Sequence, residues 1–140
     1  MISEDDSKFL QSFEDCSLGA KCWNHAAHVR MGWLVIETSP SFEAALFRIR
    51  KGILRFNSSK NSIGYHETIT VAFARIIDSR RQANETFEAF SERNPDLFQK
   101  GCLERFYSAD VLASEAAKYK FIEPDLCDLP RRETNVPSEH

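Results

Sequence analysis

The chain of 140 residues has the usual length of one domain, and its net charge of −3 argues against a nucleic-acid-binding protein, which usually carries a basic face. Hydrophobic residues make up 42% of the chain and charged residues 28%, a balance typical of a soluble globular protein. No apolar run approaches the length needed to cross a bilayer, and the acidic start MISEDDSKF is unlike a secretory leader. We therefore expect a cytoplasmic protein that binds neither nucleic acid nor membrane, with its four scattered cysteines as free thiols.

Helical periodicity runs through most of the chain, whereas strand-type alternation and hairpin turns are nearly absent. Apolar stripes bounded by capping and helix-breaking residues predict helices at about residues 4–15, 23–37, 42–56, 65–80, 82–93, 95–107 and 109–120. Ser41 and Ser108 are expected N-caps, and the Asn94–Pro95 pair is expected to end the fifth helix. The sequence thus predicts an all-α, compact single-domain bundle of about five to seven helices over residues 1–130, with residues 131–140 as a flexible tail.

The stretch WNHAAHVRMGWLVIE places two of the chain's four histidines three residues apart. On a helical wheel His28 lies at the centre of the apolar face, with His25 beside it and with Arg30 and Glu37 on the opposite, polar face. Both tryptophans of the stretch lie near its polar side, where we expect them to pack against the first or the third helix. The two histidines are therefore expected to point into the core.

A second motif, GYHETIT, opens the fourth expected helix. Its wheel places His66 on the apolar face, Glu67 at the edge between core and solvent, and Thr68 on the far side. A buried polar ring without a hydrogen bond costs about 1–3 kcal/mol, so inward histidines need partners. Because neutral imidazole nitrogen is a common metal ligand, one shared ion would satisfy all three rings.

The pattern predicts a metal site in which His25, His28 and His66 hold one divalent ion, zinc or iron, and leave a fourth position vacant, as catalytic sites do. Glu67 is the candidate catalytic residue, moving protons on a metal-bound water or substrate. Candidates for a further ligand, or for a hydrogen-bond partner of a coordinating histidine, are Glu14, Tyr65 and Thr70. The expected function is a metalloenzyme acting on a small molecule, either a hydrolase with zinc or an enzyme of oxygen chemistry with non-haem iron.

The alternative is a non-catalytic binding or structural protein whose inward histidines form a buried hydrogen-bond network. Backbone carbonyls, Tyr65 and Thr70 are the available partners of the rings. Glu67 would then stabilise the positive end of a helix dipole, and Glu14 would be a solvent-facing charge. Both hypotheses fit a helical monomer or homodimer, and metal content distinguishes them.

Five phrases occur in an order that resembles a family of small, mostly bacterial hypothetical proteins: FLQSFEDCSL, WNHAAHVRMGWLV, GYHETIT, FYSADVLASEAAK and FIEPDLCDLP. The family's motifs read W-x-H-x-A-H-L-R and G-Y-H-E-T-I-T, and the resemblance runs from Phe9 to Pro130. This chain departs from the family at Asn24, Val29 and Lys118, where threonine, leucine and arginine are usual, and at Asp128 in the final phrase. The resemblance implies that Glu14, His25, His28, His66 and Glu67 are motif positions. Because the family has no established activity, the resemblance implies no reaction.

Overall fold

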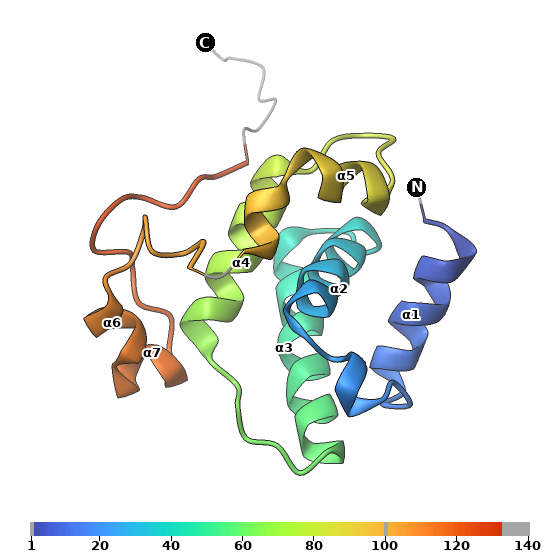
Figure 1. The fold of residues 1–140 in the computed structure, drawn as a ribbon, viewed down its shortest axis with the longest axis horizontal. Helices are drawn as coiled ribbons and strands as arrows, with labels where there is room; N and C mark the ends of the chain where they lie inside the picture. Colours follow the sequence, from blue (N-terminus) through green and yellow to red (C-terminus); the bar gives the residue numbers. More distant parts are fainter. Residues whose placement is uncertain (1, 100, 133–140) are drawn as a thin grey trace.

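The computed structural model describes residues 2–99 and 101–132, and within them it is all helical, with seven α-helices and no strand (Figure 1). The predicted all-α bundle of five to seven helices is confirmed. The α-helices are α1 (Glu4–Glu14), α2 (His25–Glu37), α3 (Phe42–Ser59), α4 (Glu67–Arg80), α5 (Phe87–Arg93), α6 (Ala109–Ala113) and α7 (Glu115–Tyr119). Two 3-10 turns, η1 (Ala20–Cys22) and η2 (Pro95–Phe98), precede α2 and follow α5. None of the helices in these residues is apolar over a length that could cross a bilayer.

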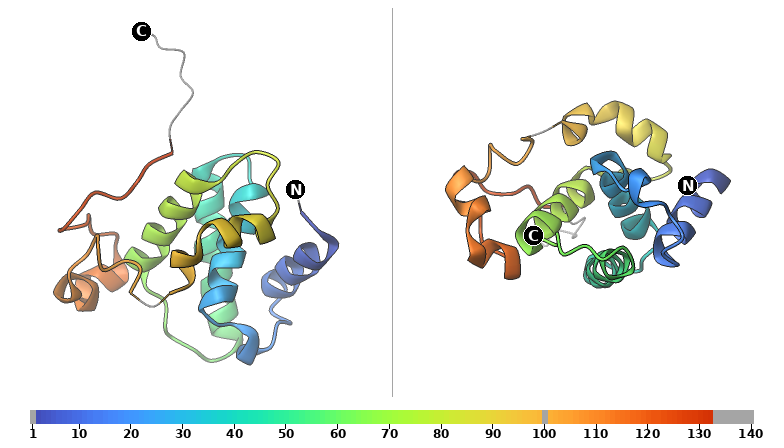
Figure 2. Two further views of the ribbon diagram at one scale, coloured as in Figure 1. Left: turned by 45° about the horizontal axis from the view of Figure 1, so that its top comes forward. Right: turned by 60° about the horizontal axis from the view of Figure 1, so that its bottom comes forward.

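Helix α2 lies at the centre of the bundle, with α1, α3, α4 and α5 packed around it (Figure 1). Helices α6 and α7 lie beside α4 on the side away from α1, as the right-hand view of Figure 2 shows. Because α2 has neighbours on several sides, its apolar residues are buried around most of its circumference rather than along one stripe. The buried residues of α2 are Ala27, Val29, Met31, Gly32, Trp33, Leu34, Val35 and Ile36.

Each α-helix of the described chain begins at a side-chain cap, which accepts a hydrogen bond from a backbone N–H in the first turn and so satisfies a donor that has no partner within the helix. The caps are Ser3, Asn24, Ser41, His66, Thr86, Ser108 and Ser114. The expected caps Ser41 and Ser108 are confirmed. His66 differs from the other caps because a ring nitrogen takes the place of an oxygen, and α4 accordingly begins one residue after it.

Two glycines allow neighbouring helices to approach closely. A Cβ added to Gly52 of α3 would lie 2.7 Å from the fully buried ring of Phe13 in α1. A Cβ added to Gly32 of α2 would lie 3.1 Å from Cδ1 of Ile77 in α4. The second approach sets how closely α2 and α4 pack along the side that carries the α2 histidines.

Ion pairs cover the expected polar face of α2. Arg30 Nη2 lies 2.7 Å from Oδ1 of Asp6 in α1, and Glu37 Oε1 lies 2.6 Å from Nη1 of Arg81 at the end of α4. Both pairs have limited exposure to solvent. Each charge on the central helix therefore meets an opposite charge, as partly buried charges require.

The two tryptophans of the α2 region pack against different helices. The ring of Trp23 stacks on Phe13 of α1, with ring centroids 4.8 Å apart, and lies 5.1 Å from Phe56 of α3, as expected. Trp33 is fully buried and instead lies 5.7 Å from Phe87 of α5. For Trp33 the ring contacts are with α5, which the sequence did not predict, because α5 folds back over α2.

The chain after α5 is less regular than predicted. Instead of a helix over residues 95–107, the turn η2 is followed by further turns, in which Gly101 has a φ of +78°. A left-handed backbone at this position interrupts helical propagation. The helix predicted over residues 109–120 is divided in two at Ser114, whose side chain caps α7.

Helix α4 holds the last part of the described chain through its own side chains. Thr68 is fully buried, donates to the carbonyl oxygen of Lys120 at 2.9 Å and accepts from the backbone N–H of Ile122 at 3.1 Å. The guanidinium of Arg75 lies 4.6 Å from the ring centroid of Phe121. The far side of this helix was expected to face solvent, and it is covered because the chain returns over it.

The end of the described chain is also attached to α4. Arg132 Nη1 donates to the carbonyl oxygens of Asp78 at 2.7 Å and of Arg81 at 3.1 Å. Of the tail predicted over residues 131–140, residues 133–140 lie outside the described part of the chain.

Candidate functional site

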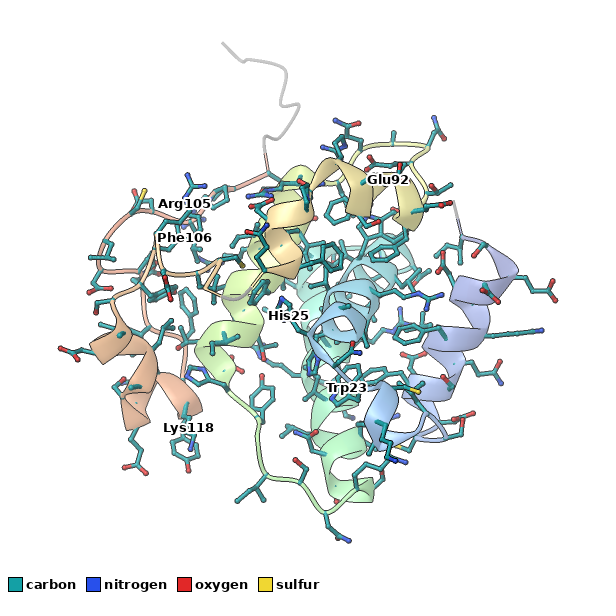
Figure 3. The ribbon with its side chains drawn as sticks, viewed as in Figure 1. Trp23, His25, Glu92, Arg105, Phe106 and Lys118 are labelled. Carbon is teal, nitrogen blue, oxygen red and sulfur yellow. The ribbon has the colours of Figure 1, made fainter. Side chains whose placement is uncertain are left out.

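His25 is the first residue of α2, and its ring lies between α2 and α4, as Figure 3 shows. The residue is exposed, which differs from the expected inward ring. Its ring meets Phe73 of α4 edge-on, with centroids 5.2 Å apart, and its Nε2 lies 2.8 Å from the carbonyl oxygen of Leu97 in η2. Because a carbonyl oxygen only accepts, Nε2 carries a proton, so the neutral form of this ring has its lone pair on Nδ1.

His28 lies one turn further along α2 and is half-buried. Its Nδ1 lies 2.7 Å from the carbonyl oxygen of Asn24, and its ring lies against Trp23, with centroids 3.8 Å apart. Nδ1 therefore donates, which leaves the lone pair on Nε2, the ring nitrogen farther from the backbone. Burial lowers the pKa of His28 and outweighs the opposite effect of the bond to Asn24, so the ring is neutral at pH 7.

His66 precedes α4 and uses both ring nitrogens in the structure. Its Nδ1 accepts from the backbone N–H of Ile69 at 3.1 Å, and its Nε2 donates to the carbonyl oxygen of Leu112 in α6 at 2.9 Å. The two bonds together require the neutral ring with its proton on Nε2. His66 could join a metal ion only by giving up the cap of α4 or the attachment of α6.

Tyr65 and Thr70, the other expected partners of the rings, turn to different groups. The hydroxyl of Tyr65 donates to the carboxylate of Glu67, and burial, followed by this bond, raises the pKa of Tyr65. Thr70 Oγ1 donates to the carbonyl oxygen of His66 at 2.8 Å. The ring nitrogens therefore find their partners in the backbone rather than in these two hydroxyls.

Glu67 is held by Arg50 of α3, whose Nε lies 2.9 Å from Oε2, and by the hydroxyl of Tyr65 at Oε1. Burial raises the pKa of Glu67, but the bonds from Arg50 and Tyr65 and the charge of Arg50 together outweigh it, and the net shift is downward. The group is therefore ionised at neutral pH and holds no proton to donate. The ion pair attaches the start of α4 to α3.

Glu14 is the last residue of α1 and makes a different ion pair. Its Oε2 lies 3.0 Å from Nη2 of Arg48 in α3, and its carbonyl oxygen accepts from Arg55 at 3.1 Å. The described residues that line the two cavities next to His28 do not include Glu14. Its contacts join α1 to α3 and leave it apart from the histidines.

The three expected histidine ligands are not assembled as a ligand group. Within residues 2–99 and 101–132, no three His, Cys, Asp or Glu side chains form a group that could hold a metal ion. His25 and His28 each use one ring nitrogen in a hydrogen bond to a backbone carbonyl, whereas His66 uses both of its nitrogens. A metal site built on all three rings would require His66 to change partners.

An inner cavity of about 100 Å³ lies between α2, α3 and α4. The polar side chains that line it are His25, His28 and Thr70. The rest of its wall is apolar and includes Met31 of α2, Ile49 and Ile53 of α3, and Phe73 and Ile77 of α4. The cavity thus brings the two α2 histidines together with side chains from three helices.

An outer pocket of about 330 Å³ adjoins this cavity and shares His28 and Thr70 with it. The outer pocket is more polar, and its further lining residues include Trp23, Asn57, Tyr65 and His66. Sequence reasoning predicted the apolar stripes of the three helices but missed the space between them and the place of Asn57. A helical wheel shows which residues face a neighbour, whereas a cavity depends on how well three faces fit together.

Comparison with known proteins adds no relative to this description: no family model, no curated protein and no solved structure gives a significant match. The resemblance of the histidine motifs to a family of small hypothetical proteins stays a prediction. What the site does is therefore argued from its own geometry.

Proposed function

We propose that the protein binds a small molecule in the inner cavity between α2, α3 and α4, with His25 and His28 as the polar groups that orient it. The observation that carries the proposal is the composition of the cavity wall, which is apolar except for two histidines and one threonine. Ligand sites of proteins combine an apolar wall with a small number of placed polar groups in this way.

The size and access of the cavity support the proposal. The cavity is partly open to solvent, since His25 in its wall is exposed, so a small molecule can enter it. A cavity of about 150 Å³ with an apolar lining accepts benzene, and the inner cavity of about 100 Å³ approaches that size. The adjoining outer pocket has room for the part of a longer ligand that does not fit inside.

The test is a screen of small aromatic and aliphatic probes by ligand-observed NMR on the full chain. We expect several probes to bind at millimolar to micromolar concentration and to perturb the methyl resonances of Ile53 and Ile77, which line the cavity. Filling the cavity by Ala74→Leu is expected to abolish this binding. If no probe binds, or if Ala74→Leu binds them as well as the natural sequence does, the proposal fails.

A second candidate function is metal binding, with His25 and His28 as ligands of one divalent ion, zinc or iron. The observation that favours it is the hydrogen bond from each ring to a backbone carbonyl, which leaves the other nitrogen unprotonated. Metal-ligating histidines commonly have this arrangement, because the carbonyl fixes the ring and its tautomer. The remaining ligands would then come from water, from the bound small molecule or from a rearranged His66.

Elemental analysis tests this second candidate. Protein purified without a histidine tag and without chelator is expected to carry one zinc or iron per chain, and His28→Ala is expected to lose most of it. Arg30→Ala is the matched control on the same helix, because Arg30 pairs with Asp6 on the side facing α1. Equal metal content in the two variants, or no metal uptake at all, rules out this candidate and leaves the first proposal unaffected.

A further inference from the structure

The three polar side chains of the inner cavity donate hydrogen bonds to backbone carbonyl oxygens. His25 donates through Nε2 to Leu97, and His28 donates through Nδ1 to Asn24. Thr70 donates its hydroxyl proton to the carbonyl oxygen of His66. None of these three acceptors can donate in return, so the directions of the bonds are fixed.

What remains on the same three side chains is lone pairs. In the neutral form of each ring, His25 has a lone pair on Nδ1 and His28 has one on Nε2. The hydroxyl oxygen of Thr70, which also interacts with Tyr65, has lone pairs as well. Among the residues that line the cavity, the other side chains are apolar or absent, as at Gly32. The side chains of the cavity therefore offer hydrogen-bond acceptors and no donor.

The charges near the site do not change this property. The guanidinium of Arg50, on the neighbouring helix α3, is paired with Glu67. A carboxylate or phosphate entering the cavity would thus meet no arginine or lysine among the described side chains that line it.

We propose that the ligand of the inner cavity is a small uncharged molecule that donates a hydrogen bond, through an O–H or N–H group on an apolar body about the size of one aromatic ring. This inference rests on the proposed function and adds the chemical class of the ligand. The donor group meets the lone pair of His28, with His25 and Thr70 as further acceptors. The apolar body fills the space between Ile53, Phe73 and their neighbours.

The first test compares probes of similar size on the natural sequence in the presence of a chelator. Phenol has the ring and the donor, toluene has the ring without the donor, and benzoate has the ring with a negative charge. Titration followed by NMR shift changes is expected to give phenol an affinity about tenfold higher than toluene, since one buried hydrogen bond supports a difference of that order. Benzoate is expected not to bind.

The second test assigns the difference to a residue. In His28→Leu, which keeps an apolar side chain of similar length and removes the lone pair, the preference for phenol over toluene is expected to fall well below tenfold. Arg30→Gln, on the same helix and outside the cavity, is expected to keep the tenfold difference. Long-range ¹H–¹⁵N spectra of the natural sequence are expected to show the proton of His28 on Nδ1 and that of His25 on Nε2.

Each outcome bears on the inference in a distinct way. Equal binding of phenol and toluene to the natural sequence, or binding of benzoate, overturns the ligand class and leaves the proposed small-molecule site intact. A preference for phenol that arises only when zinc replaces the chelator also overturns it, because the donor group would then be a metal ligand. The probe comparison needs no variant, so it decides the matter even where His28→Leu does not fold. Failure of every probe to bind would remove the proposed function as well.

Discussion

The starts of α2 and α4 both carry histidine, and the two helices use it in opposite ways. In α2 the N-cap is Asn24, whose side-chain oxygen accepts from Ala27 at 2.9 Å, so His25 and His28 each keep one nitrogen available. In α4 the cap is His66 itself, and both of its nitrogens are engaged.

The comparison shows that the residue at the N-cap decides what a nearby histidine can do. An asparagine cap satisfies the first-turn N–H and leaves the following imidazoles for a ligand. Where the imidazole is itself the cap, its nitrogens are hydrogen-bonded to the backbone and are not available to a ligand. The order of residues, Asn before His in one motif and Tyr before His in the other, therefore distinguishes a candidate ligand-binding pair from a structural residue.

The largest expected effect on stability comes from replacing His66, which caps α4 and binds α6. His66→Ala deletes the cap of α4 and leaves the carbonyl of Leu112 without its donor. A lost cap costs about 1 kcal/mol and the lost hydrogen bond to the half-buried Leu112 about 1 kcal/mol, so we expect a loss of about 2 kcal/mol in the free energy of unfolding. Urea denaturation followed by circular dichroism measures it.

The matched variants sharpen this result. His66→Asn keeps a good capping side chain and is expected to recover about 1 kcal/mol of the loss. His28→Ala, in the other motif, removes a ring whose hydrogen bond lies within its own helix, and it is expected to cost less than His66→Ala. If the two alanine variants destabilise the protein equally, the contrast between the two helix starts does not hold.

The second prediction concerns the cap of α2. Asn24→Ala removes the bond to the N–H of Ala27 and is expected to cost about 1 kcal/mol in the free energy of unfolding. Asn24→Asp and Asn24→Ser retain a capping oxygen and are expected to remain close to the natural sequence. A loss in Asn24→Ser as large as in Asn24→Ala would show that the side chain does something other than capping.

Much of the bundle could be predicted from apolar periodicity and capping residues, because both act over one or two turns of the chain. The stripe on α3 and the caps Ser41 and Ser108 are examples. The burial of Thr68 could not be predicted, because it depends on a segment more than fifty residues later that returns over α4. The left-handed backbone at Gly101 could not be predicted either, because it leaves no periodic pattern of apolar residues in the sequence.

The site shows the same limit more sharply. The wheel assigned His66 to the inner face because it treated Tyr65 as helical, whereas the helix begins at Glu67 and the ring becomes the cap. His28 was correctly expected on the side facing the core, although it is half-buried rather than fully buried. The partners of all the rings are backbone groups, carbonyl oxygens and, for Nδ1 of His66, the N–H of Ile69, so no sequence pattern marks them.

The smallest expected effect is a pH dependence at the start of α4. The pKa of Glu67 is lowered in the folded state, so its stabilising contribution is present above the ordinary pKa of a glutamate and is lost as the pH falls through the lowered value. Stability is therefore expected to decrease as the pH falls below the ordinary glutamate pKa of 4.5, by up to about 1 kcal/mol from this pair. Thermal unfolding across this range measures the decrease.

Glu67→Gln provides the control for the pH dependence. The amide does not titrate, so this variant is expected to be less stable at pH 7 and to approach the natural sequence as the pH falls. Arg50→Lys, which keeps the charge but loses the paired geometry, is expected to lie between them. Parallel curves for Glu67→Gln and the natural sequence would show that other carboxylates cause the acid sensitivity.

The attachment of the last part of the described chain has a consequence for how this surface can vary. His66 and Thr68 bind the main-chain atoms of Leu112, Lys120 and Ile122. Main-chain atoms are the same whatever side chain a residue carries, apart from the missing N–H of proline. Most outward-facing side chains between residues 109 and 122 can therefore be substituted while these hydrogen bonds persist. New side chains can be introduced on this surface without disturbing the interior.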